Sequence, residues 1–338
     1  MKCKHFPDKD TDAVVDVNVD MTLLSSATMS NGQGNPLGGN CCRVTPDGHS
    51  YITPPGLKAK IRARLLDLGS AIWITKDAVL SRGVAEAAQS IGLDVNNLAS
   101  DENADPIDQA AGDDEPAVAD ATPKKVGKKS KKVRVTRDQR LQITQAMAKK
   151  YGDFPLFGGV ITTPFNVGVR GPIHIGMSFS IDPVIPIHIK ITRMAVSNED
   201  EAKGKFSTMG DMHVLRFCVF RTDITVSPFE AAKMGLTWGM LESFIDTLPF
   251  IWSHTRAGAR GGMSFERLDI WKHAHRGGSV PSEVVFRALT VANLSPDLPT
   301  SMKDYHIEVK ALRNVTHSLI TIQSIMDENE EHSLVAAE

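Results

Sequence analysis

The chain has 338 residues, and its 38 lysines and arginines against 40 aspartates and glutamates give a formal net charge of -2. Hydrophobic residues make up 41% and charged residues 23%, which is typical of a soluble globular protein and excludes disorder of the whole chain. No run approaches the roughly 20 consecutive apolar residues of a spanning helix, and Met1–His5 lacks an apolar signal core. The four cysteines lack metal-ligand spacing, so we expect free thiols in a cytoplasmic protein.

Charge is distributed unevenly along the chain. Residues 94–122 hold nine acids and no lysine or arginine, residues 124–140 hold nine basic side chains against one acid, and residues 327–338 add five acids. This pattern predicts one domain, residues 1–338, with a partly disordered insertion over 94–136 and an acidic tail over 327–338. Without the two acidic segments, 26 acids face 38 bases, so the near-zero net charge does not exclude a nucleic-acid partner.

The first half of the chain predicts a strand, a loop and three helices. Apolar and polar residues alternate from Val15 to Leu23, which predicts a half-buried strand. A loop rich in glycine and asparagine follows over 31–40, and Thr53 before two prolines marks a helix start. We expect this helix to bury an apolar stripe and to carry a basic cluster on its remaining surface. The stripe is Leu57, Ile61, Leu65 and Leu68, and the cluster is Lys58, Lys60, Arg62 and Arg64. Further helices are predicted over 76–92 and 137–151.

The second half is dominated by strands. Strands are predicted over 156–163 and 172–181, and the runs 187–196 and 212–226 predict a long hairpin with a polar tip over 197–210. A helical region is expected from Ser227 to about Trp252, with further strands near 265–273 and 305–313. The fold class is therefore α+β, with one antiparallel sheet and helices on one face.

The loop over 31–40 and the basic helix behind it form the first candidate site. Backbone amides of such loops and four cations within seven residues suit a sugar-phosphate backbone. A plain turn and a solvated helix face explain the same residues equally well. The loop is neither a Walker loop nor a dinucleotide fingerprint, because no Gly-Lys-Ser/Thr follows and the helix starts too late.

Signs of an enzyme are weak. No nucleophile elbow or zinc-protease motif occurs, the histidines are isolated, and loop 30–40 holds no carboxylate. Glu266 and Asp269 alternate with apolar residues, so we expect them to face solvent. The aromatic residues do not form the stacking pattern of a single RNA-recognition motif, and we expect four phenylalanines in the core. These are Phe154, Phe157, Phe217 and Phe220.

Several segments, read in order, resemble one family. They are Gly39-Asn40 with Arg43 and Pro46–His49, Leu57–Arg62, Tyr151–Asp153 with Phe157-Gly158, Val169–Ile173, Ser180–Pro183, Ile191–Val196, Thr208–Gly210 with His213, Ala259–Gly261 with Met263, and Lys272-His273. Over most of 14–290 the chain resembles the Cas-seven family, the repeated backbone subunit of type I CRISPR surveillance complexes (Cascade), and within it the subtype I-C branch.

The resemblance implies a ferredoxin-like (RRM-like) palm with inserted fingers and a long β-hairpin thumb, here 187–226. It also implies a non-catalytic subunit in antiviral defence that polymerises along a CRISPR RNA and presents it for pairing with invading DNA. The implied partners are further copies of the chain, Cas-five and large-subunit types of Cascade protein, and a recruited helicase-nuclease. The protein reads the backbone and shape of the guide, and base pairing reads sequence. No metal or other cofactor is implied.

The resemblance also assigns roles to individual residues. RNA contacts are implied for Gln33, Asn40, Arg43, Lys58, Lys60, Arg62, Arg170, His174, Thr192 and Arg193. The thumb and its base wedge would use Met209, Gly210 and His213. The chain departs from the family pattern at Pro155, Phe179 and Asp211-Met212, which removes positive charge from expected RNA-facing positions, and it carries Asn35 and Leu37 where acids are usual.

Two other functions remain open. A type III-like backbone subunit would cleave target RNA with a loop aspartate, for which Asp47 or Asp211 is available. A stand-alone RNA-binding protein would lack the CRISPR partner set. Within the main hypothesis, the basic run 124–140 is expected to support guide or target strand, so neutralising Lys128, Lys129, Lys131 and Lys132 would weaken binding.

Overall fold

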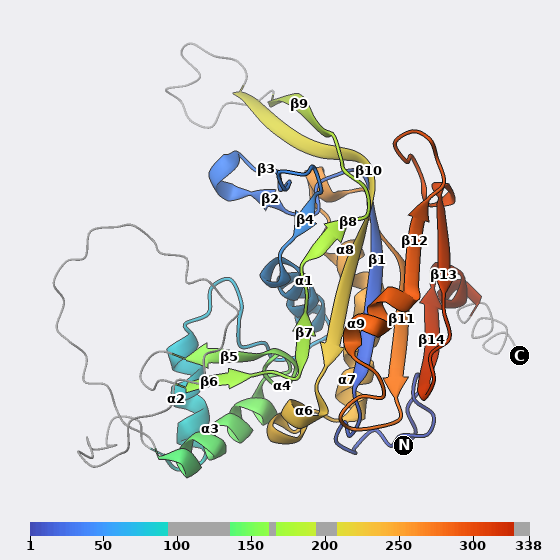
Figure 1. Ribbon diagram of the computed structural model, residues 1–338. Helices are drawn as coiled ribbons and strands as arrows, with labels where there is room; N and C mark the ends of the chain where they lie inside the picture. Colours follow the sequence, from blue (N-terminus) through green and yellow to red (C-terminus); the bar gives the residue numbers. More distant parts are fainter. Residues whose placement is uncertain (94–135, 162–166, 194–207, 328–338) are drawn as a thin grey trace, which may run out of the picture. The chain divides into compact units, whose positions relative to one another are not determined.

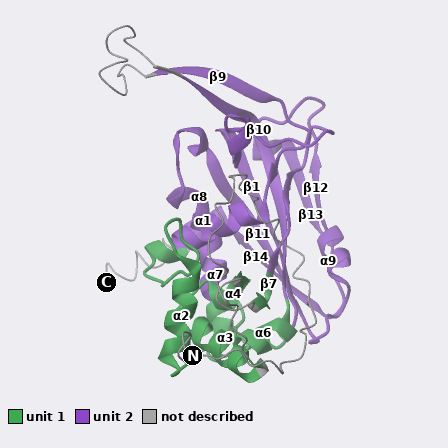
Figure 2. Ribbon diagram, turned by 90° about the vertical axis from the view of Figure 1, so that its left-hand side faces the viewer, with its two compact units in different colours: residues 1–16, 65–173, 227–241 green, residues 17–64, 174–226, 242–338 purple. Residues whose placement is uncertain are grey.

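The computed structural model describes residues 1–93, 136–161, 167–193 and 208–327. These residues form two compact units (Figures 1 and 2). Unit 1 comprises residues 1–16, 65–173 and 227–241, and unit 2 comprises 17–64, 174–226 and 242–338. The predicted acidic insertion, most of the basic run with its four named lysines, the predicted hairpin tip 197–210 up to residue 207 and the tail beyond 327 lie outside the described residues. Residues 208–210 of the predicted tip belong to a strand.

A large antiparallel sheet organises unit 2. Its strand order is β14-β11-β1-β10-β8-β4, and β7 and β9 also pair with β10. The bounds are β1 Val19–Ser30, β4 Tyr51–Ile52, β7 Ile173–Ile175, β8 Ser178–Ser180, β9 Pro186–Arg193, β10 Thr208–Val226, β11 Met263–His273 and β14 Val315–Thr321. The prediction of a mixed α and β fold with a large antiparallel sheet is confirmed.

The first strand is central to the sheet and buried on both faces. β1 pairs with β10 on one side and with β11 on the other, and even Asp20 and Thr22 are fully buried. The predicted strand is present from Val19, but its half-buried character is wrong there, because both faces are covered: Trp252 Nε1 donates to Ser25 Oγ on one face, and Leu24 packs against Tyr305 on the other. Asp20 is satisfied there: its carboxylate contacts His273 Nε2 at 3.0 Å and accepts from Ser282 Oγ at 3.1 Å.

Three small antiparallel pairs complete the strands. They are β2 (Gly34–Asn35) with β3 (Cys41–Cys42), β5 (Gly158–Ile161) with β6 (Val167–Arg170), and β12 (Leu289–Asn293) with β13 (Tyr305–Val309). The strand predicted near 305–313 is confirmed as β13. Sequence patterns missed β12 and the sheet edge β14, whose mixed polar and apolar residues show no clean alternation.

Helices were predicted with mixed precision. The observed bounds are α1 Pro54–Asp67, α2 Leu80–Ser90, α3 Arg137–Lys150, α4 Phe154–Phe157, α6 Pro228–Met234, α7 Trp238–Thr247, α8 Ile251–His254 and α9 Ser282–Ala288. Short 3-10 turns are η1 Pro36–Gly38, η2 Leu248–Phe250, η3 Gly258–Arg260 and η4 Met302–Asp304. The helix over 137–151 and the helical region after Ser227 are confirmed. The helix predicted over 76–92 begins only at Leu80, and α9 was missed.

Two predicted strands are interrupted. Residues 154–157 form α4, which starts with Pro155 in its first turn and ends where Gly158 takes φ 63°, so the strand predicted over 156–163 begins only at Gly158. The strand predicted over 172–181 is split into β7 and β8. Between them Gly176 donates its backbone N–H to Asp223 O at 2.9 Å.

Each unit has its own apolar core. In unit 1, residues of α2, α3, α4 and α6 surround Trp73 and Phe154, whose rings meet edge to face with centroids 5.4 Å apart. In unit 2, Leu24, Phe217, Val219 and Tyr305 form one buried cluster over the sheet. The four phenylalanines predicted in the core are all buried. All four cysteines are free, and burial raises the pKa of the Cys42 thiol to about 11.

Candidate nucleic-acid interface

The start of α1 is held in place by Gln33. Its side-chain oxygen accepts from the backbone N–H of Thr53 at 2.7 Å and from Thr53 Oγ1 at 3.0 Å. Thr53 Oγ1 in turn accepts from the N–H of Gly56 at 3.3 Å, as a helix cap does. A Cβ at Gly56 would lie 2.6 Å from Gln33 Oε1, so any larger residue there would displace the Gln33 side chain from Thr53. Gln33 therefore positions the helix.

The predicted loop over 31–40 is a folded turn. Asn35 caps η1 by accepting from the N–H of Leu37 at 3.3 Å, which explains why asparagine occupies this position. Asn40 is exposed and has φ 60°, and Arg43 Nε donates to Gly34 O at 3.3 Å across the turn. Leu37 is 98% exposed at the tip. Arg43 is thus partly committed to holding the loop, whereas Asn40 is accessible.

The basic cluster of α1 does not cover an open surface, and this prediction is wrong for two of its members. Lys60 is 6% exposed and Arg62 9% exposed, while Lys58 is half-buried. The aliphatic stems of long basic side chains are readily buried against apolar neighbours. Leu57, Ile61 and Leu65 of the predicted apolar stripe are buried, but Leu68 lies beyond the helix and is exposed.

Aromatic rings near α8 cover this basic face. Lys60 Nζ lies 5.5 Å from the centre of the Trp252 ring. The guanidinium carbon of Arg64 lies 5.3 Å from the centre of the Phe250 ring, and Arg64 Nη1 lies 3.5 Å from His254 Nδ1. Both arrangements are cation–π contacts, which stabilise a cation without neutralising its charge.

Arg260 of η3 adds a second cation beside Lys60. The end of β1 fixes this turn, because Asn31 N–H donates to Ala259 O at 2.6 Å and Gly262 N–H donates to Ser30 Oγ at 2.8 Å. Burial, with a smaller contribution from Arg260, lowers the pKa of Lys60 to about 8. Sequence reasoning did not name Arg260 as a site residue, although it lies within the Ala259–Gly261 segment that carried the family resemblance.

The hairpin of β9 and β10 has a polar face. Residues 208–214 of β10 pair with β9 alone, so this part of the hairpin extends beyond β1 (Figure 1). On the polar face the rings of His188 and His213 stack with centroids 4.6 Å apart. Asp211 Oδ1 lies 2.6 Å from His188 Nε2 and 2.5 Å from Lys190 Nζ. These contacts hold the pKa of Asp211 below its usual range.

The opposite face of the hairpin is apolar. Ile187, Ile189 and Ile191 alternate with the polar residues of β9, and Met212 and Val214 are their cross-strand neighbours. Asp211 and Met212 are a departure from the family pattern. Asp211 belongs to the polar face, opposite Lys190, and Met212 belongs to the apolar face, opposite Ile189. Of the predicted thumb residues, Thr192 is exposed opposite Met209, and Gly210 lies opposite Ile191. The side chains of Arg193 and Met209 lie outside the described part.

The remaining predicted positions are scattered. Arg170 is exposed at the end of β6 in unit 1, and His174 is half-buried on β7. Phe179 is 43% exposed on β8 and contacts Tyr51, with ring centroids 6.3 Å apart. Pro155 is buried in the first turn of α4, where proline suits a helix start.

The acidic residues on β11 differ from expectation. Asp269 is fully buried: it accepts from Arg267 and lies 2.9 Å from His317 Nε2, and these partners outweigh burial and lower its pKa. Burial raises the pKa of Glu266, which accepts from Ser26 Oγ. Solvent exposure is therefore the wrong explanation for both. No group of three or more His, Cys, Asp or Glu side chains among the described residues is arranged to hold a metal ion.

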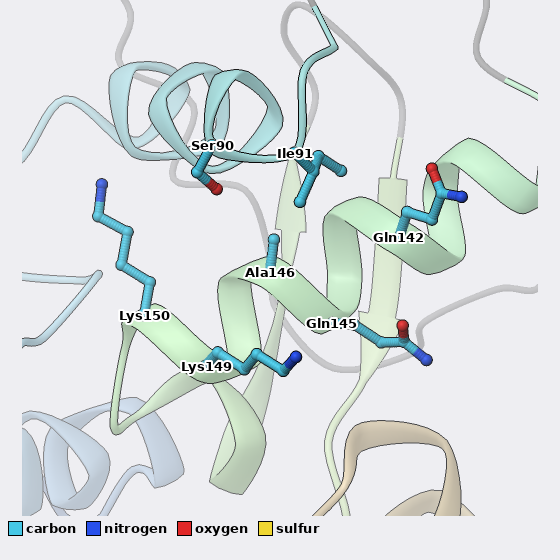
Figure 3. A pocket seen from close by; sticks show the side chains of 7 residues that line it. All are labelled: Ser90, Ile91, Gln142, Gln145, Ala146, Lys149 and Lys150. Carbon is cyan, nitrogen blue, oxygen red and sulfur yellow. The ribbon is translucent and has the colours of Figure 1, made fainter.

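Each unit has a surface hollow. Figure 3 shows that of unit 1, an open groove of about 630 Å³ between α2 and α3 where Ser90 and Ile91 face Gln142, Gln145 and Ala146. Lys149 and Lys150 lie at its α3 end, and Lys150 Nζ is bound to Glu86 at 2.6 Å. A hollow of about 160 Å³ in unit 2 lies at the base of the hairpin, between Ile185 and Leu298. Across the described residues, each helix is too short or too polar to cross a bilayer.

The folded turn, the cations of α1 and η3 and the two-faced hairpin carry the segments from which the family resemblance was drawn. The family described as "CRISPR-associated protein Cas7" matches residues 17–310, which places the chain among the CRISPR-associated proteins. The chain belongs to the Cas7 family. The resemblance to the Cas-seven family is thereby confirmed.

Solved structures with some likeness also come from CRISPR complexes. One is a chain of a "CRISPR RNA-guided surveillance complex, pre-nicking", with 14% identity, a TM-score of 0.45 and coverage of 75% of this chain and 78% of that chain. A chain of a "CRISPR RNA-guided surveillance complex" has 10% identity, a TM-score of 0.34 and coverage of 75% and 69%. A chain of the "Type III-B Cmr-beta bound to cognate target RNA" has 11% identity, a TM-score of 0.36 and coverage of 75% and 61%. No curated protein sequence matches the chain.

Proposed function

We propose that this chain is a CRISPR RNA-binding backbone subunit of a type I surveillance complex, which polymerises along the guide and presents it for pairing with invading DNA. The observation that carries this function is the Cas7 family match over residues 17–310. In the proposal the subunit is non-catalytic and acts inside the cell, where further copies, Cas-five and large-subunit proteins and a recruited helicase-nuclease are its partners.

The chemistry of unit 2 supports the proposal. A guide held for base pairing must be gripped through its phosphates and shape, which needs placed cations more than base-specific contacts. Lys60 of α1 and Arg260 of η3 supply two neighbouring cations. The hairpin offers a polar and an apolar face, which suits an element that touches nucleic acid on one side and protein on the other.

The finer assignments belong to the same proposal. They are the subtype I-C branch, a ferredoxin-like palm, one domain with the thumb over 187–226, and guide contacts by Lys58, Lys60 and Arg62. Asn40, Arg170, His174, Thr192, Arg193 and the wedge residues Met209, Gly210 and His213 are proposed to line the guide. Gln33 and Arg43 act on the guide by holding the turn and the start of α1 in place.

Co-expression tests the function directly. The chain is produced with its genomic neighbours and a CRISPR array, and the mass and RNA content of the purified complex are measured. We expect several copies of the chain on one RNA of uniform length, and cleavage of neither RNA nor DNA by the complex itself. A monomer without RNA would contradict the proposal, and metal-dependent cleavage of complementary RNA would support the type III-like alternative.

A further inference from the structure

Lys60 is a buried cation without a counter-ion. The elements that surround it are α1, α8 and η3, and their charged or titratable groups are Lys58, Arg62, Arg64, Asp67, His254 and Arg260. The single carboxylate in this set, Asp67, lies two helical turns further along α1. No hydrogen bond or ion pair joins Lys60 Nζ to another described residue, and of these groups only Arg260 contributes to its pKa shift.

Such an arrangement calls for an anion. A charge removed from water is costly unless it is paired, and a second cation beside it increases the cost. The ammonium nitrogen is not fully sealed from solvent. Among the described residues, three side-chain polar atoms are fully buried and have no hydrogen-bond partner: Arg64 Nε, Arg140 Nε and Trp271 Nε1. Lys60 Nζ also has no hydrogen-bond partner but is not one of them, so it keeps some contact with solvent.

We propose that Lys60 and Arg260 bind one phosphate of the guide RNA, and that Lys60 takes up a proton from solvent as this phosphate binds. The proposal rests on the proposed function and adds a proton to its binding step. Without RNA, the pKa of Lys60 is about 8, because burial and Arg260 both disfavour the ammonium form. A phosphate anion beside the amine favours the ammonium form, so its pKa rises on binding.

This linkage fixes the pH dependence of guide binding. Below about pH 7 Lys60 is already protonated, and the affinity is independent of its titration. Above about pH 8 binding must add the proton, so the affinity falls by up to about tenfold per pH unit for each subunit bound. Lys60→Arg removes the effect, because a guanidinium does not lose its proton in this range and still stacks on Trp252.

Calorimetry measures the proton directly. The full-length protein is titrated with a short single-stranded RNA of mixed sequence at about pH 8.5, in buffers of differing ionisation enthalpy. Their comparison gives the protons taken up per protein. Lys60→Arg is the test variant, and Lys310→Arg, an exposed lysine of unit 2, is the matched control. Thermal melts establish that both variants fold.

The outcomes separate the two proposals. We expect about half a proton or more to be taken up by the wild type and by Lys310→Arg, and none by Lys60→Arg, which still binds RNA. RNA binding without proton uptake in the wild type would overturn the inference and leave the proposed function intact. The same holds if Lys60→Arg takes up as many protons as the wild type. Absence of RNA binding by the wild type would overturn both.

Discussion

The buried face of α1 and the polar face of the hairpin both carry cations, but they treat them in opposite ways. On α1, Lys60 is buried beside Arg260 and finds no carboxylate. On the hairpin, Lys190 and His188 are exposed and share Asp211. The region of α1 and η3 therefore carries an unpaired positive charge that an RNA phosphate can neutralise. The polar face of the hairpin is locally near neutral. We infer that α1 and η3 supply the affinity for the guide, and that the hairpin acts through its shape.

The largest effect is expected from removing both unpaired cations. Lys60→Met with Arg260→Gln should weaken binding of single-stranded RNA at least a hundredfold, since each charge-assisted phosphate contact contributes about 1.5–3 kcal/mol. The slope of log affinity against log salt should fall by about 0.7, because the contact with one phosphate is lost. Lys310→Met with Arg313→Gln removes two exposed cations of unit 2 and is the matched control. Equal losses in both double variants would contradict the distinction between the regions.

Lys60→Met alone should stabilise the RNA-free protein at pH 7 by up to about 3 kcal/mol. The folded state lowers the Lys60 pKa to about 8 from 10.5, so between these values the unfolded chain binds more protons. Wild-type stability from this group therefore rises with pH, and the advantage of the variant shrinks toward pH 10. Urea unfolding at several pH values measures both free energies of unfolding. If the difference between Lys60→Met and the wild type did not change with pH, the claim that Lys60 is an unpaired buried charge would be refuted.

A third variant tests whether Gln33 positions α1 or touches RNA. Gln33→Ala removes two hydrogen bonds to Thr53 and should lower the free energy of unfolding by about 1 kcal/mol. RNA affinity should fall only severalfold, with an unchanged salt slope, because no charge is lost. Denaturant titration and binding at several salt concentrations measure both. A large loss of affinity without loss of stability would instead assign Gln33 to the guide.

The smallest effect is expected on the hairpin. Asp211→Asn removes the carboxylate from Lys190 and His188 and so makes the hairpin resemble α1 electrostatically. RNA affinity should rise a fewfold, and the salt slope should steepen by about 0.7 if Lys190 then meets a phosphate. Stability should change by less than about 1 kcal/mol, because the ion pairs are exposed. Weaker RNA binding by this variant would show that Asp211 itself serves the guide.

Sequence patterns predicted secondary structure best where the apolar residues follow a single period or where a clear helix-start signal occurs. The alternation of β9 predicted its strand, and the cap residue Thr53 with two prolines predicted the start of α1. Burial was predicted less well. The period of two in β1 cannot show whether other elements cover its polar face, so Asp20 and Thr22 were expected in solvent although both are buried.

The site was only partly predictable for the same reason. The spacing of Lys58, Lys60, Arg62 and Arg64 shows that they share a helix, but not that Trp252 and Phe250 cover it. These rings lie about 190 residues away in the sequence, and only the tertiary fold brings them to α1. Arg260 was missed as a site residue because a lone arginine in a glycine-rich turn carries no local signal.

Photo-crosslinking of bound RNA tests the central claim most directly. The full-length protein is crosslinked to single-stranded RNA, digested, and the RNA-bearing peptides are identified by mass spectrometry. We predict crosslinks in peptides of α1 (Pro54–Asp67) and η3 (Gly258–Arg260), which are lost in the Lys60→Met, Arg260→Gln double variant and kept in the Lys310→Met, Arg313→Gln control. Crosslinks confined to β9 and β10, with α1 and η3 unmarked, would contradict the assignment of RNA affinity to the buried cations.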